Sequence, residues 1–242
     1  MIVLGIESAT PVAGAAVVNN NIVLAERFVN NRKTHSVNLL PMVKAAIEEA
    51  AIEPGSIAAI AVSSGPGSFT GIRIGMSTAK TLAQVWGLPV LGVSTLDALA
   101  YSLNGLKNIV CPILNARKNE VYTAIYDNQG DSQEVVYGPA AVAPQKLVDI
   151  LNSMGKGVTF LGDGVPEYRD FLLDSLGGAQ FAPAPVLLPR GAAIAGLAAA
   201  RLRVIPGQSP LELLPRYIRL SEAENKLLQK QKAGESDAVD YN

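Results

Sequence analysis

The segment from Ser64 to Gly75 has the sequence SGPGSFTGIRIG, and the elements that flank it decide the fold class. The apolar run Ile57–Ser63 before it predicts a fully buried strand. After it, Gly65–Gly71 predicts a loop, Ile72–Trp86 a helix and Pro89–Val93 a second buried strand. A strand, loop, helix and strand in this order form a parallel crossover unit, so an α/β protein is expected.

The chain before this unit predicts a three-stranded meander and a helix. The strands are expected at Ile2–Glu7, Ala13–Val18 and Ile22–Val29, joined by tight turns. Apolar residues at three- and four-residue spacing predict a helix over Ser36–Ala50. Pro41 lies inside this pattern without an amide hydrogen to donate, so the helix is expected to start nearer Leu40.

The second half of the chain repeats this order of elements without repeating the residues. Strands are expected at Val110–Leu114, Glu120–Tyr126, Glu134–Tyr137 and Val158–Leu161, and helices at Gln145–Met154 and Pro189–Val204. Two domains are therefore expected side by side, residues 1–105 and 106–220, with the boundary near Asn104–Asn108. The polar segment 221–242 is interpreted as a frayed helix and a disordered tail.

Composition excludes several classes of protein. Of the 242 residues 49% are hydrophobic and 17% are charged, which suggests that a partner covers part of the surface. The net charge of −1 provides no general positive field, so RNA is not expected to be held by this chain alone. A single cysteine fits a reducing cytoplasm, and no signal peptide or membrane-spanning run is recognised.

The glycine-rich loop has two interpretations. Gly65, Gly67 and Gly71 leave room for close approach, and backbone amides at the start of the following helix could bind a phosphate or a carboxylate. The alternative is a sharp strand-to-helix turn that the hydroxyls of Ser68 and Thr70 cap. No Gly-Lys-Ser/Thr ending makes the loop a P-loop, so spacing alone favours the capped turn.

Several ordered motifs resemble one family. They are SGPGSFTGIRIG at Ser64–Gly75, HS at residues 35–36, LLP at 39–41, GVSTL at 92–96, NAR at 115–117, EVY at 120–122, GDG at 162–164 and PRYIR at 215–219. With these motifs the chain resembles the TsaB (YeaZ) family. The resemblance implies two ribonuclease-H-like domains of the actin-like ATPase (ASKHA) superfamily, with mixed sheets flanked by helices. It also implies a cytoplasmic, non-catalytic subunit needed to threonylcarbamoylate the adenosine next to the anticodon of transfer RNAs.

Partners follow from the same resemblance. They are the catalytic subunit TsaD, the ATPase TsaE and a second copy of the chain, with transfer RNA reached only through the complex and no membrane. In this family TsaD or the second copy docks on the helices expected after residues 36 and 72. The implied partner-binding residues are Leu39, Leu40, Val43, Ile47, Ile72, Gly75, Met76, Ala79, Leu82 and Ala83.

The second of these helices is apolar on two sides. Gly75 and Ala79 are small residues four apart, so another helix can approach closely there. A charged substitution such as Ala79→Glu is then expected to leave the domain folded and to abolish self-association and TsaD binding. Ordinary packing inside the domain is the alternative that the pattern leaves open.

A nucleotide site is a further expectation from the superfamily. The end of the first strand, with Glu7 and Ser8, resembles a phosphate-binding entry, and the loop residues Gly65, Gly67, Ser68, Thr70, Gly71 and Arg73 complete the candidate anion site. No cofactor is firmly expected on the chain alone. ATP or ADP with magnesium is expected, if anywhere, at a surface shared with the partners.

The residues argue against catalysis and against a metal. Catalytic relatives carry two histidines four residues apart, and the matching positions here hold Thr95 and Leu99. His35 is the single histidine and Cys111 the single cysteine of the sequence, which makes a poor ligand set. The chain is therefore expected not to be an enzyme. The alternatives from another class are an ATP-dependent enzyme of the same fold and a glycopeptidase-like hydrolase.

Overall fold

The computed structural model describes residues 1–31, 35–129 and 132–219, which form two five-stranded sheets. The first sheet has the order β3-β2-β1-β4-β5. Its strands are β1 (Ile2–Glu7), β2 (Ala13–Asn19), β3 (Ile22–Val29), β4 (Ile57–Gly65) and β5 (Val90–Ser94). The second sheet consists of β6 (Ile109–Asn115), β7 (Val121–Gln129), β8 (Ser132–Val142), β9 (Val158–Leu161) and β10 (Ala179–Phe181).

Both sheets have the same topology. In the first, β1 pairs antiparallel with β2 and parallel with β4, and β4 pairs parallel with β5. In the second, β6 pairs antiparallel with β7 and parallel with β9, and the order β8-β7-β6-β9-β10 repeats that of the first. A meander followed by parallel strands is the ribonuclease-H-like arrangement, and it occurs twice. The predicted α/β fold class is therefore confirmed.

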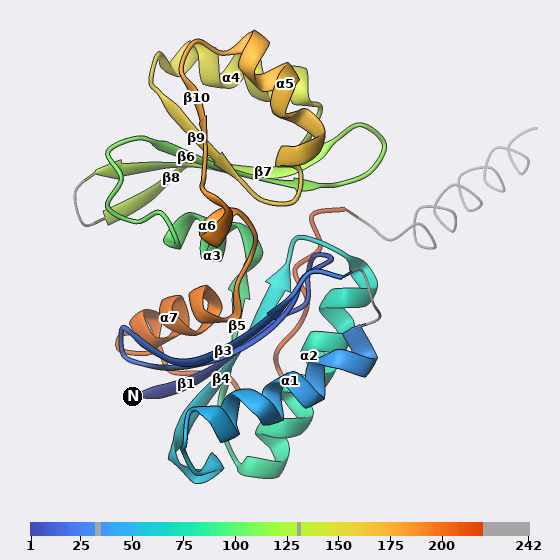
Figure 1. Ribbon diagram of the computed structural model, residues 1–242, viewed down its shortest axis with the longest axis vertical. Helices are drawn as coiled ribbons and strands as arrows, with labels where there is room; N and C mark the ends of the chain where they lie inside the picture. Colours follow the sequence, from blue (N-terminus) through green and yellow to red (C-terminus); the bar gives the residue numbers. More distant parts are fainter. Residues whose placement is uncertain (32–34, 130–131, 220–242) are drawn as a thin grey trace, which may run out of the picture.

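Helices cover both faces of the first sheet (Figure 1). Helices α1 (His35–Glu49) and α2 (Phe69–Trp86) pack on one face, and α7 (Gly191–Arg201) packs on the other. Successive side chains of a strand point to opposite faces. Accordingly Leu4 and Ile6 lie in the core below α1 and α2, while Val3 lies in the core below α7.

The second sheet is covered in the same way. Helices α4 (Pro144–Met154) and α5 (Val165–Ser175) pack on its outer face, and α3 (Thr95–Tyr101) packs on the face toward the first sheet. Asp97 of α3 accepts a hydrogen bond from Tyr126 Oη at 2.7 Å and pairs with Arg201 of α7 at 2.5 Å. The helix between the two sheets is therefore tied to the second sheet and to the helix that packs on the first.

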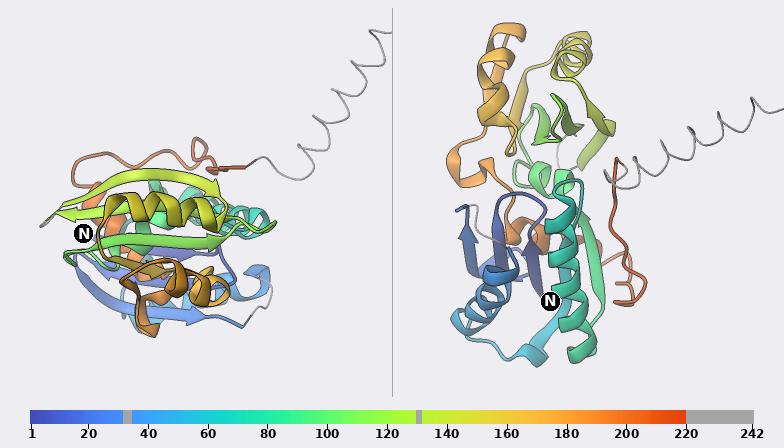
Figure 2. Two further views of the ribbon diagram at one scale, coloured as in Figure 1. Left: turned by 90° about the horizontal axis from the view of Figure 1, so that it is seen from above. Right: turned by 90° about the vertical axis from the view of Figure 1, so that its right-hand side faces the viewer.

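The chain returns to the first domain after completing the second. From β10 it passes through α6 (Ala184–Leu187) to α7 and then to residues 207–219, which we call the C-terminal strap. In the strap, Gln208 pairs with Val90 of β5, and Leu213 is only 4% exposed in the first core. Figure 2 shows the strap beside the first domain. This course differs from the expected assignment of all of residues 106–220 to the second domain.

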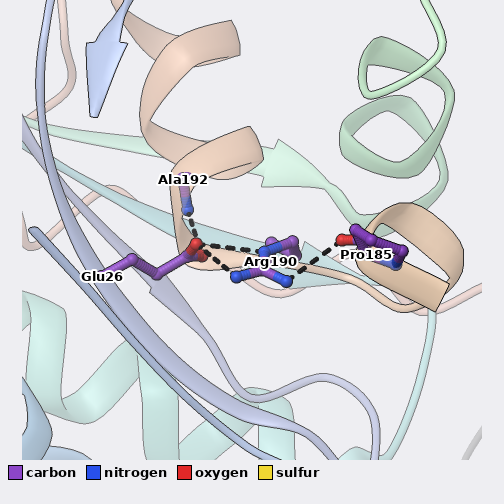
Figure 3. A network of polar contacts seen from close by, with 4 residues as sticks. All are labelled: Glu26, Pro185, Arg190 and Ala192. Atoms are coloured by element: carbon purple, nitrogen blue, oxygen red, sulfur yellow. Dashed lines mark hydrogen bonds and ion pairs between the residues drawn. The ribbon is translucent and has the colours of Figure 1, made fainter.

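A charged pair fixes the point of return (Figure 3). Arg190 donates to Glu26 Oε2 from Nε at 3.0 Å and from Nη2 at 2.7 Å, and its Nη1 donates to the carbonyl of Pro185 at 3.1 Å. Glu26 Oε1 accepts from the amide of Ala192 in the first turn of α7 at 3.1 Å. A carboxylate at a helix N-terminus is favourable because unbonded amides and the helix dipole meet it there.

Some element boundaries differ from the expected ones. Helix α1 begins at His35 and continues through Pro41, not from near Leu40. Pro41 has no amide hydrogen to donate to the carbonyl of Val37, four residues earlier. Val37 is 70% exposed, so water can solvate that carbonyl. Helix α2 begins at Phe69 because Ser68 caps it. Helices α3, α5 and α6, strand β10 and the short 3₁₀ turn Pro54–Ser56 were not anticipated, and the expected tail 221–242 lies outside the described residues.

Candidate functional site

Two loops interlock where β1 and β4 end. Ser68 donates its amide to the carbonyl of Ala9 at 2.6 Å, and the Ser8 hydroxyl donates to the carbonyl of Gly71 at 2.9 Å. Within the first loop, the amide of Ala9 donates to Glu7 Oε1 at 2.7 Å. The loop after β1 and the glycine-rich loop after β4 therefore hold each other's backbone groups.

The glycines of the second loop make room for the chain itself. A Cβ at Gly65 would lie 2.4 Å from the carbonyl oxygen of Arg216, and one at Gly67 would lie 2.1 Å from that of Ala9. A Cβ at Gly71 would lie 2.1 Å from the carbonyl oxygen of Ser8. Carbonyl oxygens carry partial negative charge and repel anions. The arrangement gives no support to anion binding at these glycines.

The capped-turn interpretation accounts for the loop instead. Ser68 is the N-cap residue of α2, and its hydroxyl accepts from the amide of Gly71 at 3.2 Å. Thr70 is exposed in the first turn and is not the cap. Arg73 is engaged with aromatic side chains, with its guanidinium 3.9 Å from the centre of the Phe69 ring and its Nε donating to Tyr217 Oη at 3.1 Å. Neither Thr70 nor Arg73 completes an anion site.

Glu7 is fully buried at the carboxyl end of β1. Its pKa is raised to about 8, chiefly by burial and to a smaller extent by the charge of Asp163 from the loop after β9, against hydrogen bonds from Ala9 and Ser63 that lower it. Burial also raises the pKa of Asp163 to about 6. Glu7 Oε2 has no hydrogen-bond partner among the described residues. Glu7 therefore stays largely protonated at neutral pH, which suits a structural group better than a magnesium ligand.

Replacing Glu7 by glutamine is expected to remove part of the pH dependence of stability. The unfolded chain loses this proton near the ordinary pKa of 4.5 and the folded chain near about 8, so the free energy of unfolding falls as pH rises between these values. Urea unfolding at pH 5 and pH 8 should show a loss of roughly 2–4 kcal/mol in the wild type. The loss should be clearly smaller in Glu7→Gln. Equal losses in both proteins would contradict the assignment.

The candidate catalytic residues do not come together. His35 Nε2 lies 2.8 Å from the carbonyl oxygen of Thr10 and anchors the start of α1. Cys111 is buried in the second domain, where burial raises the pKa of its thiol to about 12. Thr95 and Leu99 both lie in α3 and are fully buried. Over the described residues, no group of three or more histidine, cysteine, aspartate or glutamate side chains is placed to hold a metal ion.

Most of the predicted partner-binding residues belong to the core of the first domain. Eight of the ten are buried there or beneath α2: Leu39, Val43, Ile47, Ile72, Gly75, Met76, Ala79 and Ala83. Gly75 is small because a Cβ there would lie 2.1 Å from the Ser8 hydroxyl, not because a partner helix approaches. Ala79 is fully buried. The expected partner contacts at Gly75 and Ala79 are therefore wrong, and the alternative of packing inside the domain is correct for them.

An apolar groove remains between the exposed sides of α1 and α2. It has a volume of about 570 Å³ and is lined by Leu40, Val43, Lys44, Ile47, Glu48, Ala51, Ile52, Glu53, Pro54, Leu82 and Trp86. Of the predicted residues, Leu40 is 54% exposed at this groove and Leu82 is half-buried. Trp86 was missed as a site residue, although it follows Leu82 by four positions and so shares its helix face.

Known proteins with similar sequences identify the family of this chain. The family model described as "TsaD: tRNA N6-adenosine threonylcarbamoyltransferase" matches residues 23–199. The tRNA threonylcarbamoyladenosine biosynthesis protein TsaB of Bacillus subtilis is 31% identical over 233 residues, which cover 96% of this chain and all of that protein. The chain belongs to the TsaB (YeaZ) family. The predicted family is thereby confirmed.

Solved structures agree with the TsaB assignment. YeaZ from Pseudomonas aeruginosa is 26% identical, with a TM-score of 0.75, over 89% of this chain and 99% of that one. An uncharacterized Pseudomonas aeruginosa protein with similarity to peptidase YeaZ is 25% identical, with a TM-score of 0.78, over 90% and 99% of the two chains. Within the described ranges of this TsaB-family chain, no helix is long and apolar enough to cross a membrane.

Proposed function

We propose that the chain is a non-catalytic accessory subunit in the threonylcarbamoylation of the adenosine next to the anticodon of transfer RNAs. It docks on TsaD through the groove between α1 and α2 and supports the active form of that subunit. TsaE joins the same assembly, and transfer RNA is brought to it in the cytoplasm. The observation that carries the proposal is the exposed apolar groove on a chain that belongs to the TsaB family.

The groove has the features of a helix-docking site. Leu40 of α1 and Leu82 and Trp86 of α2 provide apolar side chains to the groove, and Lys44 and Glu48 provide charged ones. Amphipathic helices bind such grooves through apolar side chains at three- and four-residue spacing. The resemblance to TsaB proteins, in which these helices receive TsaD, supports TsaD as the occupant. We further propose that a second copy of the chain covers the groove when TsaD is absent, because exposed apolar surface favours association.

A hydrolase is the rival function, which the name of the Pseudomonas aeruginosa peptidase-like neighbour raises. A nucleophile needs an adjacent base and access to substrate. The thiol of Cys111 is buried with a raised pKa, and His35 uses Nε2 to anchor a loop in the other domain. These two residues support structural roles, so we favour the accessory function over the hydrolase.

Nucleotide binding is proposed for the assembly and not for the chain alone. In the isolated chain, carbonyl oxygens face the loop glycines and Glu7 is fully buried. Neither feature favours binding of a magnesium nucleotide. A ligand that binds only the folded state raises the apparent melting temperature by mass action. We expect ATP with magnesium to raise the melting temperature of the complex with TsaD and to leave that of the isolated chain unchanged. A clear rise for the isolated chain would show that it holds a nucleotide site of its own.

Co-purification with TsaD from the same organism tests the proposed function. A stable complex that forms transfer RNA threonylcarbamoyladenosine only when this chain is present supports it. TsaD that modifies transfer RNA equally well without the chain, or that does not bind it, would rule the proposal out.

A further inference from the structure

The turn between β6 and β7 is strained. Arg117, Lys118 and Asn119 are consecutive, non-glycine residues, and all three have left-handed backbone angles, with φ of 61°, 55° and 55°. Each such residue costs roughly 1–2 kcal/mol relative to a right-handed conformation. Strain of this kind persists where the surroundings fix the backbone, and it is found preferentially at functional sites.

The end of the C-terminal strap holds this turn in place. Arg219 forms an ion pair of 2.7 Å with Glu120 and donates from Nη1 to the carbonyl of Ala116 at 3.3 Å. Asn115 Oδ1 accepts from the amide of Arg117 at 2.9 Å, and the amide of Ala116 donates to the carbonyl of Glu120 at 3.0 Å. The turn of the second domain is thereby fastened to a segment that packs on the first domain.

Further cations follow the strap toward α2. Tyr217 stacks on Phe69 with ring centres 4.7 Å apart, and Arg73 lies over Phe69 while bonding to Tyr217. We call Arg73, Arg117, Lys118 and Arg216 the basic strip. All four are exposed: Arg73 lies on α2 and Arg216 in the strap, while Arg117 and Lys118 lie in the β6–β7 turn of the second domain. Figure 1 shows the β6–β7 turn and the end of the strap on the same side of the molecule.

The strip is a local exception to the charge balance of the chain. Among the described residues its four cations have no ion-pair partner. Three acids lie near the turn: Glu120 is paired with Arg219, and Asp163 and Glu167 accept hydrogen bonds from Asn115. The whole chain carries a net charge of only −1. Arg117 and Lys118, which are neighbours in the strained turn, repel each other, so a polyanionic ligand is favourable there.

The chemistry of the strip favours nucleic-acid phosphates over an acidic protein. The centres of protein–protein interfaces are depleted in charge and contain apolar anchors, which here lie in the separate groove between α1 and α2. The aromatic rings beside the strip, Phe69 and Tyr217, stack on each other, and Arg73 covers Phe69, so this stack offers little ring surface to bases. Contacts to the sugar–phosphate backbone need only cations and carry no sequence information.

We propose that the basic strip contacts the phosphate backbone of the transfer RNA while the chain is docked on TsaD, an inference that rests on the proposed function. Four cations are too few to hold RNA alone, in agreement with the near-neutral chain, but they add to the affinity of an assembly. Each phosphate neutralised contributes about 0.7–0.9 to the slope of log affinity against log salt.

The test compares two triple variants in the complex with TsaD. The first removes three charges from the strip: Arg117→Gln, Lys118→Gln and Arg216→Gln. The matched control removes three charges from exposed residues elsewhere: Lys107→Gln, Lys146→Gln and Arg203→Gln. Binding of an unmodified transfer RNA transcript is measured by fluorescence anisotropy at several salt concentrations. The strip variant should bind roughly tenfold more weakly, with the slope reduced by about 2, and the control should match the wild type.

Other outcomes overturn the inference in distinguishable ways. If the strip variant is folded and co-elutes with TsaD but binds RNA with the wild-type slope, the strip does not contact RNA, and the proposed function stands. If it is folded but no longer co-elutes with TsaD or TsaE, the strip faces a protein. If the wild-type chain itself fails to co-elute with TsaD, both the proposed function and the inference fail.

Discussion

Replacing Ala79 by glutamate is expected to destabilise the first domain strongly, not merely to release a partner from its surface. The side chain is fully buried in the core formed by α1, α2 and the first sheet. A carboxylate there has to be desolvated without a partner, which costs several kcal/mol, or about half of the 5–15 kcal/mol that stabilises a typical domain. At about 2–4 °C per kcal/mol for a chain of this size, the melting temperature should fall by roughly 10 °C or more.

The matched control for this variant is Thr81→Glu. Thr81 lies two positions further along α2 and is exposed. Its replacement by glutamate therefore adds the same charge to the same helix without burying it. Its melting temperature should stay close to that of the wild type. Thermal circular dichroism of the three proteins decides the matter. If Ala79→Glu melts like Thr81→Glu and loses TsaD, the buried placement of this helix face is wrong.

Periodicity predicted the apolar stripes of α2 but not what covers them. A pattern of apolar residues shows that a face avoids water, and it is the same whether the chain's own sheet or another protein covers that face. Gly75 illustrates the limit, because its small size suits the hydroxyl of Ser8, a contact 67 positions away that no local pattern contains. The strands with continuous apolar runs were the most predictable elements for the same reason: their burial does not depend on the identity of the neighbour.

The return of the chain to the first domain was also beyond a local pattern. Helix α7 consists almost entirely of small apolar residues. Such a sequence predicts that the helix is buried but does not indicate which sheet it packs on. Its position depends on Glu26 and Arg190, which lie 164 positions apart. The basic strip likewise depends on contacts between distant segments, since Arg219 and Glu120 meet only after folding. The loop after β4 was half predictable, because the Ser68 cap has a sequence signature and the carbonyls facing the glycines do not.

Replacing Leu40 by glutamate is expected to weaken docking on TsaD strongly while the chain stays folded. Leu40 is 54% exposed, so a charge there is solvated in the free chain, and Lys44 one turn later can pair with it. In a complex that fills the groove, the same carboxylate would be buried against apolar side chains. Central apolar anchors of an interface contribute about 2 kcal/mol or more each, and a trapped charge costs more, so affinity should fall by at least about 30-fold.

The control is Leu173→Glu on α5, because Leu173 is a helical leucine with a similar exposure of 47% on the second domain. Titration calorimetry with TsaD should give wild-type affinity for this control, and both variants should melt within a few degrees of the wild type. Light scattering of the free proteins then tests the second copy, since Leu40→Glu should be monomeric if self-association uses the same groove. Wild-type TsaD affinity in Leu40→Glu would exclude the groove as the docking site, and loss of affinity in Leu173→Glu alone would place TsaD on the second domain.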